Sequence, residues 1–347
     1  MRPRPIANPP NPWASGEVEY LEEPPRAKLH VYEDLTKEIV ASNDSPDLGF
    51  RFSVNPYRGC MHACAYCYAR PTHEYLSLGA GTDFDTKIAV KLRAPELLRA
   101  TFERPSWKGE LLVFSGVTDC YQPLEASYRL TRGCLEVCAA YRNPVAIITK
   151  APLVERDLDV LQELARTAQV RVNVSIPFWN PEHARAIEPG VATPKRRLQT
   201  VARLAAVGVP VGVMVAPIIP GLSDESIAQI LEAARDAGAT SAGYVLLRLP
   251  KSVKQVFETR MREELPLRAE KVLHRVRQTR GGALYDSRFG VRGRGEGKYA
   301  EALGAVFEAT ARRLGFPSRE HSPTPTTFRR RQLPLPLGEG RGEGTST

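Results

Sequence analysis

The sequence lacks the features that mark membrane and secreted proteins. Its 347 residues contain no run of about eighteen apolar residues, so no membrane-spanning helix is expected. The amino-terminal stretch from Met1 carries arginines but no apolar core of the kind that a secretory signal requires. Cysteine is scarce, and six cysteines in a chain of this length do not make a disulfide scaffold. We therefore expect a cytoplasmic protein.

Positive charge is unevenly distributed along the chain. The net charge is +9, and residues 266–347 hold 16 Lys and Arg against 8 Asp and Glu, so the other residues together carry only +1. The densest basic stretch runs from Arg268 to Lys298. Such a stretch can bind nucleic acid or another phosphate-bearing partner, and it can equally be the solvated face of a helix. The sequence leaves both interpretations open.

The two ends of the chain differ in composition from its middle. Residues 1–45 are rich in proline and charge, without a clear period, and we expect an extended arm. Residues 317–347 contain Pro-rich and Gly-rich stretches and three consecutive arginines, and we expect a disordered tail. Between them we expect a core barrel over residues 46–262 and a basic helical extension over residues 263–316.

Short apolar strands alternate with amphipathic helices through the middle of the chain. The expected strands cover residues 50–55, 111–115, 145–149, 170–176, 209–216 and 242–248. The expected helices include residues 124–140, 153–168, 194–207 and 223–237. This repetition predicts an α/β fold with a parallel sheet and right-handed crossovers. Six units predict a partial (β/α)6 TIM-like barrel, whose active site should lie at the carboxyl ends of the strands.

Three cysteines directly follow the first expected strand. Cys60, Cys64 and Cys67 form a C-x3-C-x2-C pattern. Three thiolates at this spacing can hold three corners of a cubane iron–sulfur cluster and leave the fourth iron open to a small molecule. A zinc site is the alternative, and it would need a fourth ligand such as His62 or His73.

With Tyr66 before the last cysteine, this motif resembles that of the radical S-adenosylmethionine (radical SAM) superfamily. The resemblance implies a partial (β/α)6 barrel of the radical SAM type, a [4Fe–4S] cluster on the three cysteines, and S-adenosylmethionine as second cofactor. It implies reductive cleavage of that cofactor to a 5′-deoxyadenosyl radical, which abstracts hydrogen from a substrate. It also implies a flavodoxin- or ferredoxin-type electron donor, and the cluster needs a reducing compartment.

The segment after the second expected strand resembles a narrower subgroup. Residues Thr118 to Glu125 read Thr-Asp-Cys-Tyr-Gln-Pro-Leu-Glu, which is similar to spore photoproduct lyase and DNA repair photolyase-like proteins. This resemblance implies a lyase-type reaction on a nucleic-acid lesion or modified nucleotide. A protein or small-metabolite substrate is an alternative, and so is a non-catalytic iron–sulfur protein that binds nucleic acid.

The same subgroup suggests a role for Cys120. The lyase uses a cysteine of the corresponding loop as hydrogen donor, so Cys120 is a candidate for that step, although it follows the Thr-Asp pair rather than preceding it. A buried structural cysteine is the alternative. Cys134 and Cys138 share a helical face and are either core thiols or, with Cys120, metal ligands. Asp119 is either a polar contact to cofactor or substrate, or a helix cap.

The resemblance further implies which residues contact S-adenosylmethionine. Tyr66 and Ile219 correspond to positions near the adenine, and Ser175 corresponds to a cofactor-contacting serine. Backbone carbonyls at Ser115 and Gly116 could accept from the methionine ammonium, because glycine permits close backbone approach. Lys150 suits the carboxylate, with a surface lysine as the alternative reading; the cofactor contacts expected are therefore those of Tyr66, Ser115, Gly116, Lys150, Ser175 and Ile219.

Overall fold

A seven-stranded sheet, of which six strands are parallel, forms the centre of the protein. The computed structural model describes residues 28–317 and 326–330. The strand order is β10-β9-β8-β7-β6-β3-β2, and only β2 at the edge is antiparallel. The strands are β2 (Val40–Ser42), β3 (Phe52–Val54), β6 (Leu112–Phe114), β7 (Val145–Thr149), β8 (Val170–Ser175), β9 (Val211–Ile218) and β10 (Ser241–Leu246).

These parallel strands confirm the expected partial (β/α)6 barrel. They are rich in valine and isoleucine, whose branched side chains pack well on a pleated surface. Phe114, Ile147, Val172 and Val213 come from four neighbouring strands, are fully buried and belong to one continuous core. The main core therefore lies between the sheet and its helices, and the carboxyl ends of the six strands remain for a site.

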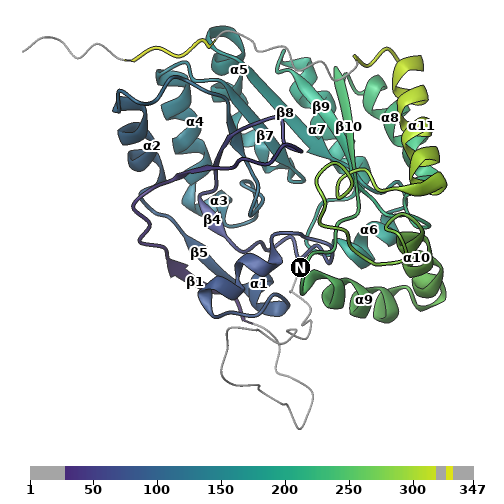
Figure 1. The fold of residues 1–347 in the computed structure, drawn as a ribbon. Helices are drawn as coiled ribbons and strands as arrows, with labels where there is room; N and C mark the ends of the chain where they lie inside the picture. The colour runs from purple at the N-terminus through teal and green to yellow at the C-terminus, as the bar shows by residue number, and fades with distance from the viewer. Residues whose placement is uncertain (1–27, 318–325, 331–347) are drawn as a thin grey trace, which may run out of the picture.

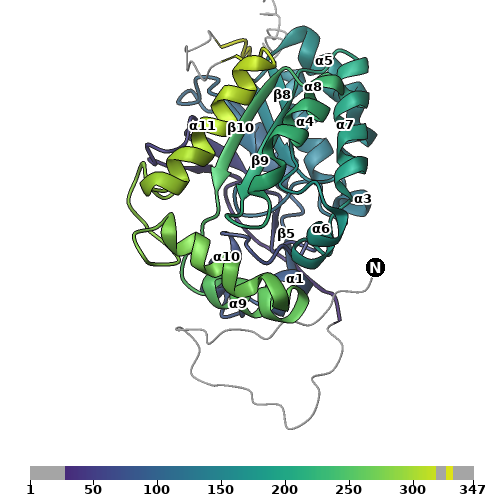
Figure 2. The same ribbon diagram turned by 90° about the vertical axis from the view of Figure 1, so that its right-hand side faces the viewer.

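Helices cover the outer face of the sheet in chain order (Figures 1 and 2). The outer helices are α2 (Ala94–Glu103), α4 (Leu130–Ala140), α5 (Leu158–Thr167), α7 (Pro194–Ala206), α8 (Ile227–Asp236) and α11 (Gly297–Arg313). The helices that lie nearer the carboxyl ends of the strands are α1 (Thr82–Thr86), α3 (Glu125–Tyr128), α6 (Pro181–Ile187), α9 (Val253–Glu264) and α10 (Pro266–Gln278). The described residues also contain four short 3-10 helices: η1 (Arg70–Thr72), η2 (Glu74–Leu76), η3 (Pro152–Asp157) and η4 (Asp224–Ser226).

Two local features differ from the sequence-based expectation. The helix expected over residues 124–140 is divided into α3 and α4, because Arg129 between them adopts a left-handed conformation with φ of 53°. A separate three-stranded sheet was not expected. It consists of β1 (His30–Glu33), β5 (Lys87–Val90) and β4 (Tyr57–Arg58) in the order β1-β5-β4.

The segment of residues 284–296 joins the two edges of the open sheet. On the β10 side, the Leu246 amide donates to the Gly293 carbonyl at 2.9 Å. On the β2–β3 side, the Gly290 amide donates to Asp47 at 2.7 Å, and the Arg292 guanidinium pairs with the same carboxylate. Residues from opposite ends of the chain thus close the open side of the partial barrel.

A short piece near the carboxyl terminus packs against the ends of two helices. The ring of Phe328 packs against the rings of Phe102 and Tyr141, with centroids 5.6 and 6.2 Å away, and those two rings also contact each other. The Arg330 guanidinium donates to backbone carbonyls after α2, including that of Trp107 at 2.9 Å. The Arg329 amide donates to the Tyr141 carbonyl at the end of α4 at 2.8 Å. The bonds to Arg104 and Tyr141 reach the C-caps of α2 and α4, where carbonyls lack intrahelical partners.

The remaining expectations about the ends of the chain are only partly covered. Residues 28–45 of the expected arm contain β1 and β2, whereas residues 1–27 lie outside the described residues. Of the expected tail, residues 318–325 and 331–347 lie outside them as well, and residues 326–330 are the packed piece. The boundary expected at residue 262 falls inside α9.

Candidate functional site

The three cysteines of the motif lie in a loop between β4 and η1, beyond the carboxyl end of β3. Cys60 and Cys64 are buried, Cys67 is partly buried, and all three thiols are free. Tight turns use the backbone: the Cys60 carbonyl accepts from Ala63 and the Cys64 carbonyl from Cys67, both at 3.2 Å. Cys67 packs against the apolar groups that contain Cys60 and Cys64. The loop therefore carries, within eight residues, three cysteines that form no disulfide.

The thiols influence one another electrostatically, which tests whether they suit a metal cluster. Burial raises the pKa of Cys67 to about 11, and the charge of Cys60 adds to the shift. Burial also raises the pKa of Cys64, helped by the charges of Glu188, Cys67 and Cys60. Burial also acts on Cys60, but the charge of His62 outweighs it and lowers the pKa of that thiol. Cysteine thiolates are the ligands of iron–sulfur clusters, so this donor set fits such a cluster. Within the described residues, no three His, Cys, Asp or Glu side chains are placed to hold a single metal ion.

Asp119 links the cysteine loop to the ends of two strands. His62 Nδ1 lies 3.3 Å from Asp119 Oδ2, and both groups are buried. Asp119 follows β6, and its carboxylate accepts from the Thr149 hydroxyl and the Lys150 amide, each at 2.7 Å. Thr149 is the last residue of β7. The Asp119 carboxylate is thus engaged by protein groups and does not cap a helix. The charges of Cys60 and Asp119 overcome the effect of burial and raise the pKa of His62 to about 10.

Thr118 and Gln122 hold the cysteine loop from the same side. The Thr118 hydroxyl and the Gln122 amide both donate to the Gly59 carbonyl, at 2.7 and 3.0 Å. The Gln122 carbonyl oxygen accepts from the Met61 amide at 3.1 Å. Gly59 has φ of 81°, and a Cβ there would lie 2.9 Å from the Phe84 carbonyl, so glycine is required. The Thr-Asp-Cys-Tyr-Gln segment therefore positions the loop.

We expect Gln122→Ala to weaken retention of a cluster. The change leaves the Met61 amide without its partner and costs about 1–3 kcal/mol. The measurement is iron and sulfide content after anaerobic reconstitution, together with the melting temperature. Gln162→Ala is the matched control, because the Gln162 amide donates to Val207 on the outer surface. Equal iron content in both variants would contradict a positioning role for Gln122.

Tyr66 belongs to a buried hydrogen-bonded network. Its hydroxyl donates to the Glu188 carboxylate, which also pairs with the Arg197 guanidinium. Arg197 donates in turn to the Ser175 carbonyl at 2.8 Å, at the end of β8. The Lys150 ammonium lies 5.7 Å from the centre of the Tyr66 ring. Glu188 and Arg197, which the sequence did not reveal, thus connect Tyr66 with Ser175.

The other predicted cofactor contacts lie at the same edge of the sheet. Lys150 follows β7 and is not an exposed surface lysine; burial lowers its pKa, but the charges of Cys64 and Glu188 outweigh it and raise the value. Ile219 follows β9, is fully buried and belongs to the same apolar group as Tyr66. Ser115 and Gly116 follow β6, both with positive φ, of 149° and 128°. Such a backbone is costly for serine and is typical of functional loops.

Cys120 does not share the surroundings of the motif cysteines. Its side chain is fully buried in the main core with Cys134 and Cys138, and its thiol contacts the Phe114 carbonyl at 3.7 Å. Burial raises the pKa of all three thiols. The role of hydrogen donor for Cys120 stays a prediction, and it requires the thiol to reach the strand ends from this core.

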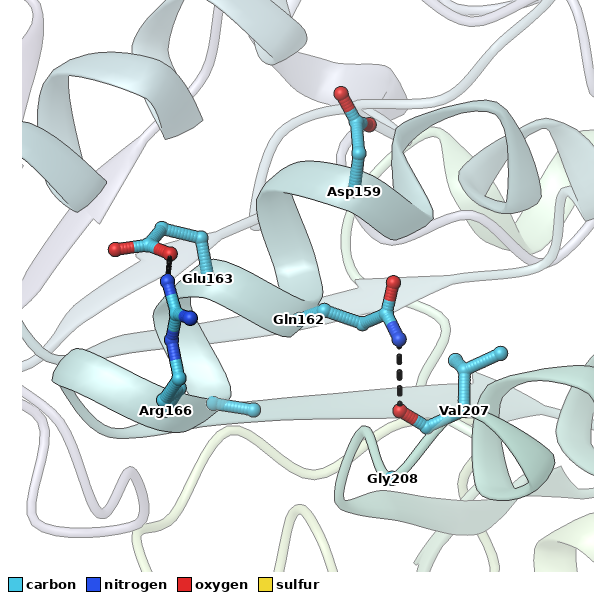
Figure 3. Close-up of a pocket in the computed structure, with 7 residues that line it drawn as sticks. Asp159, Gln162, Glu163, Arg166, Val207 and Gly208 are labelled. Carbon is cyan, nitrogen blue, oxygen red and sulfur yellow. Dashed lines mark hydrogen bonds and ion pairs between the residues drawn. The ribbon is translucent and has the colours of Figure 1, made fainter.

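A surface hollow on the outside of the barrel contains none of the predicted site residues (Figure 3). It lies beside α5 and the turn after α7. Its lining includes Asp159, Gln162 and Val207, and an ion pair between Glu163 and Arg166. Without a thiol, a histidine or a buried charge, it offers no chemistry comparable to that of the cysteine loop.

Comparison with known sequences decides the family. Residues 54–234 match the Radical SAM superfamily, and this range is more than half of the chain. The chain belongs to the radical SAM superfamily. Radical SAM proteins use a [4Fe–4S] cluster and S-adenosylmethionine, and these are therefore its cofactors. The family resemblance of the cysteine motif is confirmed.

Two relatives of this radical SAM protein are named as uncharacterized proteins. An uncharacterized protein of Mycobacterium tuberculosis is 43% identical over 212 residues, which cover 60% of this chain and 62% of the relative. An uncharacterized protein of Methanocaldococcus jannaschii is 30% identical over 198 residues, or 57% of this chain and 71% of the relative. The match thus spans less than two thirds of the mycobacterial protein.

Solved structures resemble this radical SAM fold over most of its length. Spore photoproduct lyase complexed with dinucleoside spore photoproduct has a TM-score of 0.61 at 16% identity, covering 83% of this chain and 79% of the lyase. A lyase variant with bound AdoMet and the same dinucleoside has a TM-score of 0.57 at 19% identity, covering 82% and 78%. The similarity establishes a shared fold.

Within the described residues, no helix is long and apolar enough to cross a membrane.

Proposed function

We propose that Cys60, Cys64 and Cys67 hold the [4Fe–4S] cluster of this enzyme. The observation that carries the proposal is the position of three free cysteines in one loop at the carboxyl edge of a partial barrel. Bound there, the cluster would supply the electron for reductive cleavage of S-adenosylmethionine to methionine and a 5′-deoxyadenosyl radical. The protein's own task is to orient the cofactor and to exclude water.

The residues around the loop suit the parts of S-adenosylmethionine. Tyr66 and Ile219 share one apolar group that can receive the adenine. The Lys150 ammonium can pair with the methionine carboxylate, and the backbone at Ser115 and Gly116 can accept from the ammonium. Ser175 adds a polar contact beside them. Glu188 holds the Tyr66 hydroxyl and so fixes the orientation of its ring.

A nucleic-acid lesion or modified nucleotide is the substrate that we propose. The fold shared with spore photoproduct lyase supports this class, because that lyase binds a dinucleoside photoproduct. The C-terminal basic stretch supports it less than charge counting suggests. Five of its nine Lys and Arg residues, namely Arg275, Arg277, Arg280, Arg288 and Arg292, already have side-chain or carbonyl partners.

The experiment that tests this function is an anaerobic turnover assay. The protein is reconstituted with iron and sulfide, reduced with dithionite or a flavodoxin system as electron donor, and given S-adenosylmethionine with ultraviolet-irradiated or untreated DNA. We expect 5′-deoxyadenosine in both cases and repaired or altered nucleotide only with irradiated DNA. Cofactor cleavage that no nucleic acid affects would shift the substrate class to proteins or metabolites. If the protein held a full cluster but formed no 5′-deoxyadenosine, a non-catalytic role would be favoured. We propose the reducing cytoplasm as its location in either case.

Cys120→Ala separates the two roles of that cysteine. Because the thiol is buried in the core, we expect a loss of about 1 kcal/mol in the free energy of unfolding and unchanged 5′-deoxyadenosine formation. A hydrogen donor would behave differently, since the product radical would remain unquenched and side products would accumulate. Mass spectrometry of the products distinguishes these outcomes, with Cys138→Ala as the control for a buried core thiol.

A further inference from the structure

Three exposed aromatic side chains near the cysteine loop each have a cation above the ring. Tyr68, Tyr75 and Phe289 are 50%, 68% and 58% exposed. The charged groups of Arg248, Lys251 and Arg292 lie 5.4, 5.7 and 4.2 Å from the respective ring centres. We call these three pairs the aromatic row. Exposed apolar side chains that form one patch mark interaction surfaces, whereas scattered ones do not.

The pairs of the aromatic row are contiguous and adjoin the proposed cluster site. Tyr68 directly follows Cys67, and its partner Arg248 follows β10. Lys251 lies three residues further along the same loop and reaches Tyr75 in η2. On the other side, the charge of Arg248 contributes to lowering the pKa of Asp47, which pairs with Arg292. The row therefore runs from η2, past Cys67, to the segment of residues 284–296.

Two cations of the row remain available to a ligand. Arg248 and Lys251 form no ion pair with any carboxylate among residues 28–317 and 326–330. The Nε atom of Arg248 and the Oγ atom of the nearby Ser252 are buried without a hydrogen-bond partner. The cations of the basic stretch differ, because Arg288 and Arg292 are held by carboxylates.

This chemistry fits a chain of unpaired nucleotides. Every base offers a flat face that stacks on tyrosine or phenylalanine, while lysine and arginine track the phosphates. A duplex hides those faces between neighbouring base pairs, so it cannot use the rings. An acidic peptide could pair with the cations but would leave the three rings without a matched partner.

We propose that the aromatic row is a binding surface for single-stranded nucleic acid that leads a nucleotide to the cysteine loop. The inference rests on the proposed nucleic-acid substrate and narrows it to an unpaired or locally opened strand. The row reads no sequence, since stacking accepts every base. It provides affinity for the strand beside the cysteine loop, because Tyr68 directly follows Cys67.

The test is oligonucleotide binding without turnover. Cluster-loaded protein, without reductant or S-adenosylmethionine, is titrated into fluorescein-labelled oligo(dT) or oligo(rU) and into a DNA duplex of equal length, and anisotropy is followed over a salt series. We expect single strands to bind more tightly than the duplex. Tyr75→Ala and Phe289→Ala should each weaken binding about tenfold. Lys251→Ala should reduce the slope of log K against log salt by about 0.7.

Matched variants make the result decisive. Tyr75→Trp should restore the affinity that Tyr75→Leu loses, because tryptophan stacks and leucine does not. Tyr128→Ala, at a tyrosine 37% exposed on α3, and Lys195→Ala, at an exposed lysine of α7, should bind like the unaltered protein. Comparison of the two single strands identifies whether DNA or RNA is preferred.

Several outcomes would overturn the proposal. Undiminished binding by Tyr75→Ala and Phe289→Ala would do so, and so would tighter binding of duplex than of single strand. If polyglutamate displaced the oligonucleotide completely, and substitutions in the aromatic row weakened its binding, the surface would be assigned to an acidic peptide instead. The outcome is independent of the proposed function: absence of 5′-deoxyadenosine removes the radical activity and leaves the affinities unchanged, whereas absence of row-dependent binding leaves cofactor cleavage standing.

Discussion

Replacing Cys60, Cys64 and Cys67 together by alanine is expected to abolish both cluster binding and 5′-deoxyadenosine formation. No described side chain outside the motif offers a comparable set of free thiols beside Tyr66 and Lys150. Without thiolate ligands the iron has no holder, and without the cluster the cofactor receives no electron. We expect the rate of 5′-deoxyadenosine formation to fall by more than about a thousandfold, which corresponds to about 4 kcal/mol of barrier.

The measurement combines iron and sulfide analysis, electron paramagnetic resonance of the reduced protein and chromatography of 5′-deoxyadenosine. Cys138→Ala is the control, since that thiol is equally buried but lies in the main core. It should retain the full cluster. A triple variant that still binds four irons per chain would refute the ligand assignment, and zinc in place of iron would revive the alternative metal site.

Glu188→Ala should be the most destabilising single change near the site. The carboxylate is fully buried and holds both the Arg197 guanidinium and the Tyr66 hydroxyl. Its removal leaves a buried positive charge without a partner, which costs about 3–5 kcal/mol. At roughly 2–4 °C per kcal/mol, we expect the melting temperature to fall by about 10 °C. The freed Tyr66 ring should also raise the KM for S-adenosylmethionine more than it lowers kcat.

Thermal denaturation and cofactor kinetics check this expectation. Glu163→Ala is the matched control, because Glu163 pairs with Arg166 on the surface and such pairs contribute at most about 1 kcal/mol. Glu188→Gln retains a hydrogen-bond acceptor for Tyr66 but loses the charge that Arg197 needs, so an intermediate effect is expected. Equal melting temperatures for Glu188→Ala and Glu163→Ala would show that the buried network does not stabilise the fold.

The parts of the fold and site that the sequence predicts are those encoded locally. Alternation of apolar strands with amphipathic helices depends on residues within one turn or one strand, and it predicted all six parallel strands. The spacing of Cys60, Cys64 and Cys67 is equally local. The short strands β1, β2, β4 and β5 were missed, because none of them belongs to the six strand–helix units on which the prediction rests, whereas the equally short β3 and β6 do.

The supporting residues were missed for a different reason. Glu188 lies 122 residues from Tyr66, and Gln122 lies 61 residues from the Met61 amide, so no sequence window contains both partners. Either residue could equally have been a surface side chain. Asp119 was recognised as polar and close to the site, but its partners on His62, Thr149 and Lys150 exist only once three strand ends meet.

The basic stretch shows the same limit for charge. Its sequence gives the number of cations but not the carboxylates that the fold brings to them. Arg292 meets Asp47 across 245 residues. The cations that remain available, Arg248 and Lys251, lie outside the stretch and are noticeable only beside Tyr68 and Tyr75.

The packing of Phe328 against Phe102 and Tyr141 has a consequence for folding during synthesis. Synthesis proceeds from the amino end at about 5–20 residues per second, so the ribosome needs roughly 10–40 s to pass from residue 141 to residue 328. During that interval the carbonyls at the ends of α2 and α4 lack the donors that Arg329 and Arg330 later provide. The aromatic surface of Phe102 and Tyr141 therefore lacks its cover until residues 326–330 have been synthesised.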